Sequence, residues 1–130
     1  MKKHIVIVDD EPDIRDVLCQ ALQAKGYRVT AAEAGHEALR IIKSDPPDLL
    51  VSDLQMEDAD GLELIGEIKQ LLPDLPVILL TGMIFDPEVI RETISKKVSC
   101  YLDKTSSLQK VMQEVQRLLG DLKPGVAAPV

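Results

Sequence analysis

Apolar and polar positions divide the chain into five short apolar runs, each followed by a segment with helical periodicity. The runs are rich in β-branched residues, which favours strands. They cover Ile5–Val8, Tyr27–Ala31, Leu49–Ser52, Val77–Leu80 and Ser99–Leu102. Several are apolar throughout instead of alternating with polar residues, as expected of strands that are buried on both faces of a parallel sheet.

Between the apolar runs, apolar residues recur at helical spacing. The first helix is predicted from the stripe Ile14, Val17, Leu18, Ala21 and Leu22. Pro12 stands near its start and Gly26 at the position just after its end, as is typical of helix termini. Four further helices are predicted at Gly35–Ser44, Gly61–Leu72, Pro87–Lys97 and Leu108–Leu119.

Strands that alternate with helices at this spacing predict a doubly wound α/β domain with five β–α units. Right-handed crossovers would give a five-stranded parallel sheet with helices on both faces. Ligands of such sheets bind beyond the carboxyl ends of the strands, at the switch point of the topology. We expect the domain to span residues 1–120, and residues 121–130 to form a flexible tail or the start of a linker.

Composition excludes several classes of protein. The 130 residues suffice for one globular domain, with 45% hydrophobic and 28% charged residues. The net charge is −7 and the pI is about 4.8, the wrong sign for attracting phosphate backbones or anionic lipid. We therefore expect no direct nucleic-acid binding by this segment and no membrane association.

The remaining composition signals indicate a cytoplasmic protein. No apolar run reaches membrane-spanning length, and the N-terminal residues lack a secretory h-region. Cys19 and Cys100 are predicted to be buried, reduced thiols and not a disulfide or metal pair. His4 and His36 have no ligand spacing, which is typical of surface histidines or histidines satisfied by a hydrogen bond.

Carboxylates, a hydroxyl and a lysine follow the predicted strands. They are Asp9, Asp10, Glu11, Asp53, Thr81 and Lys104. Each has a structural alternative, because acids and threonine cap helices and lysines are commonly solvated. Chance agreement among four strand ends is less plausible than a shared site. Converging carboxylates suit Mg²⁺, and Asp53, alone after the central strand, is the candidate nucleophile for an acyl phosphate.

The motifs "IVDDEP", "LLVSDLQM…DG" and "VILLTG" occur in this order. With them the chain resembles the receiver domains of two-component response regulators, the CheY-like family, over residues 3–120. The resemblance implies a flavodoxin-like fold and a Mg²⁺ site, with Mn²⁺ as an alternative ion. The metal ligands it implies are Asp9, Asp10, Asp53 and the backbone carbonyl of Gln55.

The resemblance also implies a role for each remaining strand-end residue. Asp53 is the phosphoacceptor, Lys104 binds the phosphoryl group, Thr81 is the switch hydroxyl and Tyr101 is the aromatic switch residue. The phosphodonor histidine lies on a partner, a sensor histidine kinase or phosphotransfer protein. The output goes to an unidentified partner or a fused effector domain. We expect slow autodephosphorylation and not enzymatic turnover.

Three alternative functions share parts of this pattern. A flavin or dinucleotide site is disfavoured because an acidic loop after the first strand repels phosphate. A haloacid-dehalogenase-type phosphatase would need an acid where Gln55 stands. A pseudo-receiver, acting as a phosphorylation-independent interaction module, stays open, because Thr105 replaces the proline that usually follows the lysine and the expected output face is atypical. The retained acids argue against the pseudo-receiver.

Overall fold

The computed structural model describes residues 2–53, 61–81, 99–103 and 108–119. The strands in these ranges are β1 (His4–Val8), β2 (Arg28–Ala32), β3 (Leu49–Ser52), β4 (Val77–Thr81) and β5 (Cys100–Asp103). The helices are α1 (Pro12–Ala24), α2 (Gly35–Ser44), α3 (Gly61–Leu71) and α5 (Leu108–Leu119). The helix predicted at Pro87–Lys97 and the tail predicted at 121–130 lie outside the described residues.

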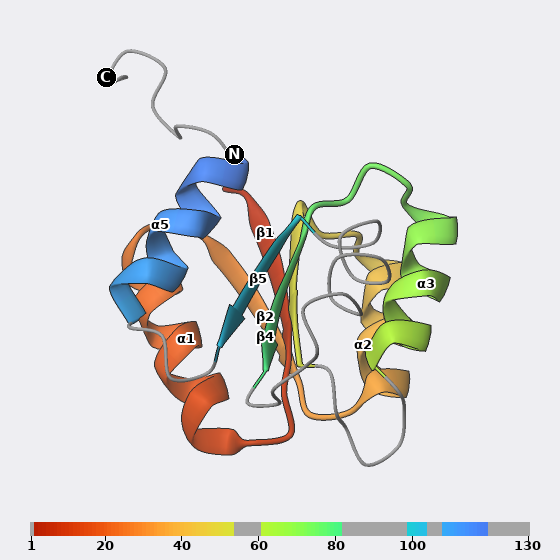
Figure 1. Cartoon of the computed structure of the whole chain (residues 1–130), viewed down its shortest axis with the longest axis horizontal. Helices are drawn as coiled ribbons and strands as arrows, with labels where there is room; N and C mark the ends of the chain where they lie inside the picture. Colours follow the sequence, from red (N-terminus) through yellow and green to blue (C-terminus); the bar gives the residue numbers. More distant parts are fainter. Residues whose placement is uncertain (1, 54–60, 82–98, 104–107, 120–130) are drawn as a thin grey trace.

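The strands form one parallel sheet in the order β2-β1-β3-β4-β5. The chain runs from β1 through α1 to β2 at one edge and returns through α2 to β3 on the other side of β1 (Figure 1). This reversal places the switch point between β1 and β3. The doubly wound, flavodoxin-like architecture predicted from the sequence is confirmed, and the crevice for a ligand lies where β1 and β3 end.

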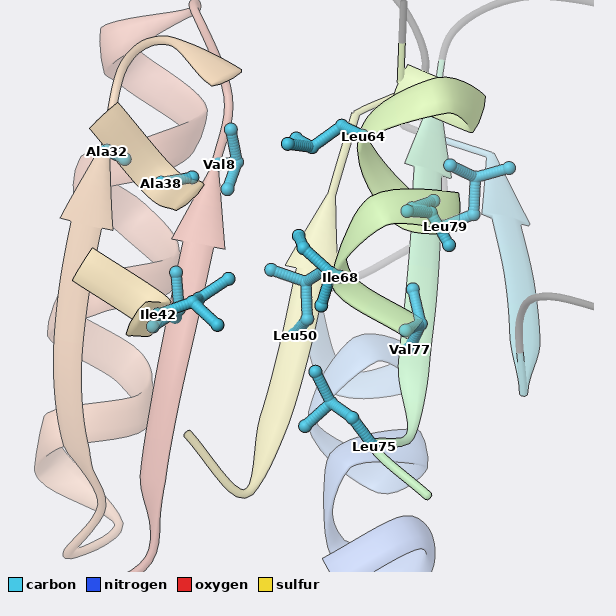
Figure 2. Packing of buried hydrophobic residues seen from close by; sticks show 12 residues of the cluster. Val8, Ala32, Ala38, Ile42, Leu50, Leu64, Ile68, Leu75, Val77 and Leu79 are labelled. Atoms are coloured by element: carbon cyan, nitrogen blue, oxygen red, sulfur yellow. The ribbon is translucent and has the colours of Figure 1, made fainter. Parts of the chain in front are cut away.

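Two apolar clusters cover opposite faces of the sheet. Val6 and Val8 of β1 pack with residues of α2 and α3, including Ile42 and Ile68 (Figure 2). The alternate residues of β1 pack into the second cluster, whose members are Ile5, Ile7, Leu18, Leu22, Tyr27, Leu49, Val51, Ile78, Leu80, Leu102, Val111 and Val115. These members include side chains from α1 and α5. A strand with both faces packed must be apolar at every position, which explains the continuous run in β1.

The end of α1 follows the predicted pattern. Gly26 has φ of +100°, a conformation that L side chains rarely adopt. The N–H of Gly26 donates to the carbonyl of Gln23 at 3.0 Å, and the N–H of Tyr27 donates to the carbonyl of Leu22 at 3.2 Å. These two bonds form a Schellman motif. Tyr27 is buried beside Leu22, so the helix end is tied to the core and the chain turns directly into β2.

The apolar stripes of the helices were predicted with some errors. Leu18 and Leu22 of α1 are buried, but Val17 is 50% exposed. The predicted stripe was too wide, because the contact of α1 with the sheet centres on Leu18 and Leu22 and Val17 lies about 100° around the helix from Leu18. Leu108, at the start of α5, is likewise exposed.

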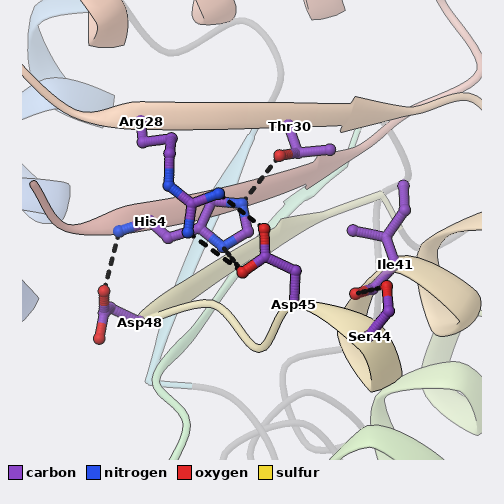
Figure 3. Close-up of polar contacts among 7 residues, drawn as sticks. All are labelled: His4, Arg28, Thr30, Ile41, Ser44, Asp45 and Asp48. Carbon is purple, nitrogen blue, oxygen red and sulfur yellow. Dashed lines mark hydrogen bonds and ion pairs between the residues drawn. The ribbon is translucent and has the colours of Figure 1, made fainter.

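His4 lies at the start of β1 and is buried, with 1% exposure. Its Nε2 shares a 2.8 Å hydrogen bond with Oγ1 of Thr30 on β2 (Figure 3). Its Nδ1 makes no hydrogen bond among the described residues and lies 3.8 Å from Oδ1 of Asp45. Arg28 donates to both carboxylate oxygens of Asp45, at 2.6 and 3.1 Å. The amino ends of β1 and β2 are therefore joined to the end of α2 by polar contacts.

Cys19 and Cys100 are free thiols, as predicted, but each is only half buried. Burial is the largest cause of a raised pKa at both thiols. Within the described part of the chain, no helix combines the length and the apolar character needed to cross a membrane.

Candidate functional site

The two central strands place two carboxylates side by side. Val8 and Ser52 are paired across β1 and β3, so Asp9 and Asp53 are the next residues on neighbouring strands. The N–H of Asp53 donates to the carbonyl of Val8 at 3.0 Å, and the N–H of Asp9 donates to the carbonyl of Ala32 at 3.2 Å. The sheet ladder thus continues one residue beyond the strands and holds the main chain of both acids.

Four acidic side chains converge at this point. One carboxylate oxygen each from Asp9, Asp10, Glu11 and Asp53 can be chosen so that all lie within 4.8 Å of one another. Asp9 is 2% exposed and Asp53 is 5% exposed, whereas Asp10 and Glu11 are exposed. The cluster therefore has a buried side formed by the strand ends and a side open to solvent. The structure brings together the three acids that the sequence analysis assigned to one site.

The loop between β1 and α1 is ordered by its own hydrogen bonds. Oδ1 of Asp9 accepts a 2.8 Å bond from the N–H of Glu11, and the main-chain carbonyl of Asp9 accepts a 2.7 Å bond from Nη1 of Arg15. Glu11 is the N-cap residue of α1, but its side chain makes no capping hydrogen bond. A capping hydrogen bond therefore does not account for the acid at position 11, whereas its charge still complements the dipole of α1.

Ser52, the last residue of β3, contacts the main chain of Asp53. It is fully buried, and its Oγ donates a 2.9 Å hydrogen bond to the carbonyl oxygen of Asp53. Together with the bond from the Asp53 N–H, this contact constrains the peptide groups on both sides of the candidate phosphoacceptor.

Sequence reasoning missed two residues of this region, Ser52 and Arg15. The sequence places Glu11 among the strand-end acids, but the metal set that the resemblance implies leaves it out, although it is the third acid of one short loop. Ser52 carried a signal, because a hydroxyl that ends an otherwise apolar buried run needs a partner. Arg15 carried none, since its contact with Asp9 depends on the position of α1 relative to β1.

The other predicted site residues are described only in part. Thr81 ends β4, where its backbone is paired with Asp103 of β5, and the backbone of Tyr101 is paired with Leu79. These pairings place Thr81 at the same edge of the sheet as Asp53. The side chains of Thr81 and Tyr101, and all of Gln55, Lys104 and Thr105, lie outside the described part of the structure. Their roles stay predictions.

The donor set of the cluster fits a hard divalent cation. Its four residues offer carboxylate oxygens, which Mg²⁺ and Mn²⁺ prefer over softer ligands. The exposed side leaves room for the water that Mg²⁺ retains. The N-terminus of α1 also begins beside the cluster, and its dipole favours negative charge there.

Comparison with known proteins identifies the family of the chain. The family model described as "Response regulator receiver domain" matches residues 5–116. The transcriptional regulatory protein GlrR of Escherichia coli is 34% identical, over 93% of this chain and 27% of its own length. The response regulator MprA of Mycobacterium bovis is 35% identical, over 98% of this chain and 55% of its own length. The chain therefore spans between a quarter and just over half of these relatives.

Solved structures extend the comparison to the fold. The response regulator TrrA of Thermotoga maritima, in complex with Mg²⁺-BeF, matches with 36% identity and a TM-score of 0.79, over 91% of this chain and 99% of its own. A CheY-like receiver domain protein of Methanospirillum hungatei matches with 27% identity and a TM-score of 0.85, over 92% and 94% of the two chains. The chain belongs to the response regulator receiver domain family of two-component signalling.

Proposed function

We propose that this chain is a phosphorylation-dependent signalling switch, in which Asp53 accepts a phosphoryl group from a partner sensor histidine kinase or phosphotransfer protein. The observation that carries the proposal is the convergence of Asp53 with Asp9, Asp10 and Glu11 at the switch point of the sheet. Holding carboxylates that repel one another at one point costs stability, and a bound cation offsets that cost. A buried carboxylate beside a cation site is suited to phosphoryl transfer.

The chemistry assigns the central step to Asp53. One carboxylate oxygen attacks the phosphorus of the donor phosphohistidine, and an acyl phosphate forms. The phosphorus–nitrogen bond breaks, and its electron pair stays on the imidazole. The ladder bond from the Asp53 N–H and the Ser52 bond to its carbonyl hold the main chain of the nucleophile during the attack. Preorganisation of this kind lowers the cost of reaching a reactive geometry.

The acidic loop holds the cation in this proposal. Asp9 and Asp10 bind it through carboxylate oxygens together with Asp53, and the backbone carbonyl of Gln55 is the predicted further ligand. When bound, Mg²⁺, or Mn²⁺ in its place, offsets negative charge on the phosphoryl oxygens. Among the predicted roles, Lys104 and Thr81 bind the remaining phosphoryl oxygens.

The switch itself rests on differential contacts. A phosphoryl group shifts the protein between two conformations with different output surfaces only if it makes better contacts in one of these conformations. Thr81 and Tyr101 are the predicted residues that change position.

We propose residues 1–120 as the receiver domain of a cytoplasmic protein and residues 121–130 as a tail or the start of a linker. The output acts through a partner or a fused effector domain. Slow self-hydrolysis, not enzymatic turnover, ends the signal.

The test is the intact mass of the protein after incubation with acetyl phosphate, with and without Mg²⁺. The wild type should gain one phosphoryl group only when Mg²⁺ is present, and Asp53→Asn should gain none. Asp74→Asn is the matched control, because Asp74 is an exposed acid in the loop before β4 and its substitution changes the charge equally. This control should gain the group as the wild type does.

The same experiment decides between the switch and the pseudo-receiver. A wild-type protein that gains no mass, and that gives no calorimetric signal on titration with MgCl₂, would support a phosphorylation-independent interaction module. A phosphoryl group that still attaches to Asp53→Asn would mean that another residue is the acceptor.

A further inference from the structure

Arg15 is a half-buried cation that contacts the acidic loop between β1 and α1. It lies in α1, and its side chain is 17% exposed. Its Nη1 donates a 2.7 Å hydrogen bond to the main-chain carbonyl of Asp9. Its Nη2 lies 3.7 Å from Oε2 of Glu33, a side chain that is 73% exposed. The short bond to Asp9 is charge-assisted and therefore stronger than a bond between neutral groups.

The carbonyl that Arg15 contacts belongs to the peptide group between Asp9 and Asp10. Because a peptide group is planar, fixing the direction of this carbonyl restricts ψ of Asp9 and φ of Asp10 together. Both residues are predicted metal ligands. A contact with one main-chain oxygen can therefore set the direction of two carboxylates.

The other bonds of Asp9 complete the constraint. Its N–H donates to Ala32, and its Oδ1 accepts from the N–H of Glu11. Asp9 is thus held at its N–H, its carbonyl and one carboxylate oxygen, from β2, α1 and the loop itself. The contact through the carbonyl is the one that a side chain supplies, so it is the one that substitution can remove.

Arg15 also supplies positive charge to the cluster. Its 2.7 Å bond is made to a main-chain oxygen, so the guanidinium lowers the repulsion among the acids without itself taking up a carboxylate oxygen of the cluster. A guanidinium placed among the carboxylates would instead compete with the cation for them. The position of Arg15 favours an ordered acidic loop before any ion binds.

We propose that Arg15 is a positioning residue of the cation site, which orients the Asp9–Asp10 peptide group and so raises the affinity for Mg²⁺. This inference rests on the proposed function, because it assigns the cation to that same site. Residues that orient metal ligands typically change metal affinity roughly 10- to 100-fold when they are removed.

The test is isothermal titration calorimetry of the unphosphorylated protein with MgCl₂. Arg15→Met keeps the length and apolar stem of the side chain but removes its charge and the donor to the Asp9 carbonyl. It should weaken Mg²⁺ binding about tenfold or more. Arg15→Lys keeps an N–H donor for the main-chain carbonyl of Asp9 and should restore part of the affinity. Glu33→Gln removes the exposed contact of Arg15 and should stay within about twofold of the wild type, since exposed pairs contribute little.

Arg40→Met is the matched control for charge. Arg40 lies on α2, its side chain is 77% exposed, and its contact with Glu37 is 4.0 Å long. Its substitution removes one positive charge at the surface and should leave Mg²⁺ affinity within about twofold of the wild type, because exposed charges are screened. The rate of phosphorylation by acetyl phosphate at saturating Mg²⁺ should fall much less in Arg15→Met than the affinity does.

The outcomes separate this inference from the proposed function. Equal Mg²⁺ affinity in Arg15→Met, Arg40→Met and the wild type would overturn the role of Arg15 and leave the proposed function intact. No Mg²⁺ binding by the wild type would overturn both. Circular dichroism shows whether Arg15→Met is folded. If it is not, the same comparison between Arg15→Lys and Arg40→Met decides, and equal affinities in that pair would also overturn the inference.

Discussion

The backbone N–H of Asp53 donates a 3.0 Å hydrogen bond to the carbonyl of Val8, so β3 continues its pairing with β1 into the acidic site. The carboxylates of Asp9 and Asp53 are consequently close because of the sheet, and not because a flexible loop brings them together. Their repulsion is therefore present in every folded molecule that has no bound cation. This relationship makes the stability of the protein sensitive to the charge of the site.

The first prediction is that Asp53→Asn stabilises the protein in the absence of Mg²⁺. Coulomb's law with an effective dielectric constant of about 20 gives roughly 3 kcal/mol for two unit charges about 5 Å apart, and exposure of Asp10 and Glu11 reduces the benefit. We expect the free energy of unfolding to rise by about 1 kcal/mol, or several degrees in Tm. Thermal melts in a chelating buffer measure it.

Addition of Mg²⁺ should raise the Tm of the wild type, because an ion that binds the folded state stabilises it by mass action. It should raise the Tm of Asp53→Asn less, since one ligand is lost. Asp74→Asn serves again as the control and should respond to Mg²⁺ as the wild type does. Melts that change with neither the substitution nor Mg²⁺ would contradict the geometry of the acidic cluster.

The second prediction concerns Gly26. No heavy atom outside its chain neighbours lies within 4 Å of an added Cβ, so a side chain there meets no steric obstacle beyond its own backbone. The φ of +100° alone should make Gly26→Ala destabilising, by about 1 to 2 kcal/mol. Gly26→Asn should cost less, because asparagine tolerates positive φ better. Urea denaturation compares the stability of the three proteins. An alanine variant as stable as the wild type would show that the positive φ imposes no strain on a side chain at this position.

The third prediction is a pH dependence set by Arg28 and Asp45. The hydrogen bonds from Arg28 hold the pKa of Asp45 below its usual value, with a smaller contribution from the charge of His4. A depressed pKa contributes stability above the unfolded-state pKa, near 3.9, and that stability is lost as the pH falls through the lower folded pKa. The wild type should therefore be more stable than Asp45→Asn near neutral pH and should lose this extra stability below about pH 4.

Urea midpoints between about pH 2.5 and 6 test this dependence, because the window brackets the unfolded-state pKa of Asp45. The side chains of Arg28 and Asp45 are about half exposed, at 50% and 46%. Salt should consequently reduce the difference in urea midpoint between the wild type and Asp45→Asn. Curves that stay parallel over the whole pH range would show that the pair does not couple protonation to folding.

The fourth prediction uses the two thiols as internal references for each other. Burial raises the pKa of Cys100 most, and a hydrogen bond to Glu114 raises it further, whereas Arg117 lowers it. Glu114→Gln should therefore lower the pKa of Cys100 and speed its alkylation by iodoacetamide near pH 8, because the thiolate is the reactive form. Cys19 should react at an unchanged rate in the same molecule. Equal acceleration at both thiols would indicate general loosening of the fold.

Sequence reasoning succeeded where a local pattern is sufficient. The continuous apolar run of β1 predicts burial on both faces, and proline and glycine at the ends of α1 predict its limits. Asp9 and Asp53 could be placed together because parallel strands end at the same edge of the sheet. For His4 the sequence left a surface position and a satisfied hydrogen bond both open, and its burial could not be predicted because it depends on the contact with Thr30 across the β1–β2 pair.

The support of the site was predicted least well. Arg15 contacts Asp9 only because α1 packs at a particular angle against the sheet, and no spacing along the chain encodes that angle. The exposure of Val17 has the same origin. Tertiary packing therefore decides which residues assist the acids, whereas secondary structure decides which acids meet.

The alternation of β1 between the two apolar clusters has a consequence for motion. Ile5 and Ile7 belong to one cluster, and Val6 and Val8 to the other. Local opening of β1 would have to disrupt both at once, so its amide hydrogens should exchange with solvent only through nearly global unfolding. The edge strand β2, with its more exposed side chains, is free to open at lower cost. Brief excursions at the edge of the sheet can therefore leave the carboxylates after β1 and β3 in place.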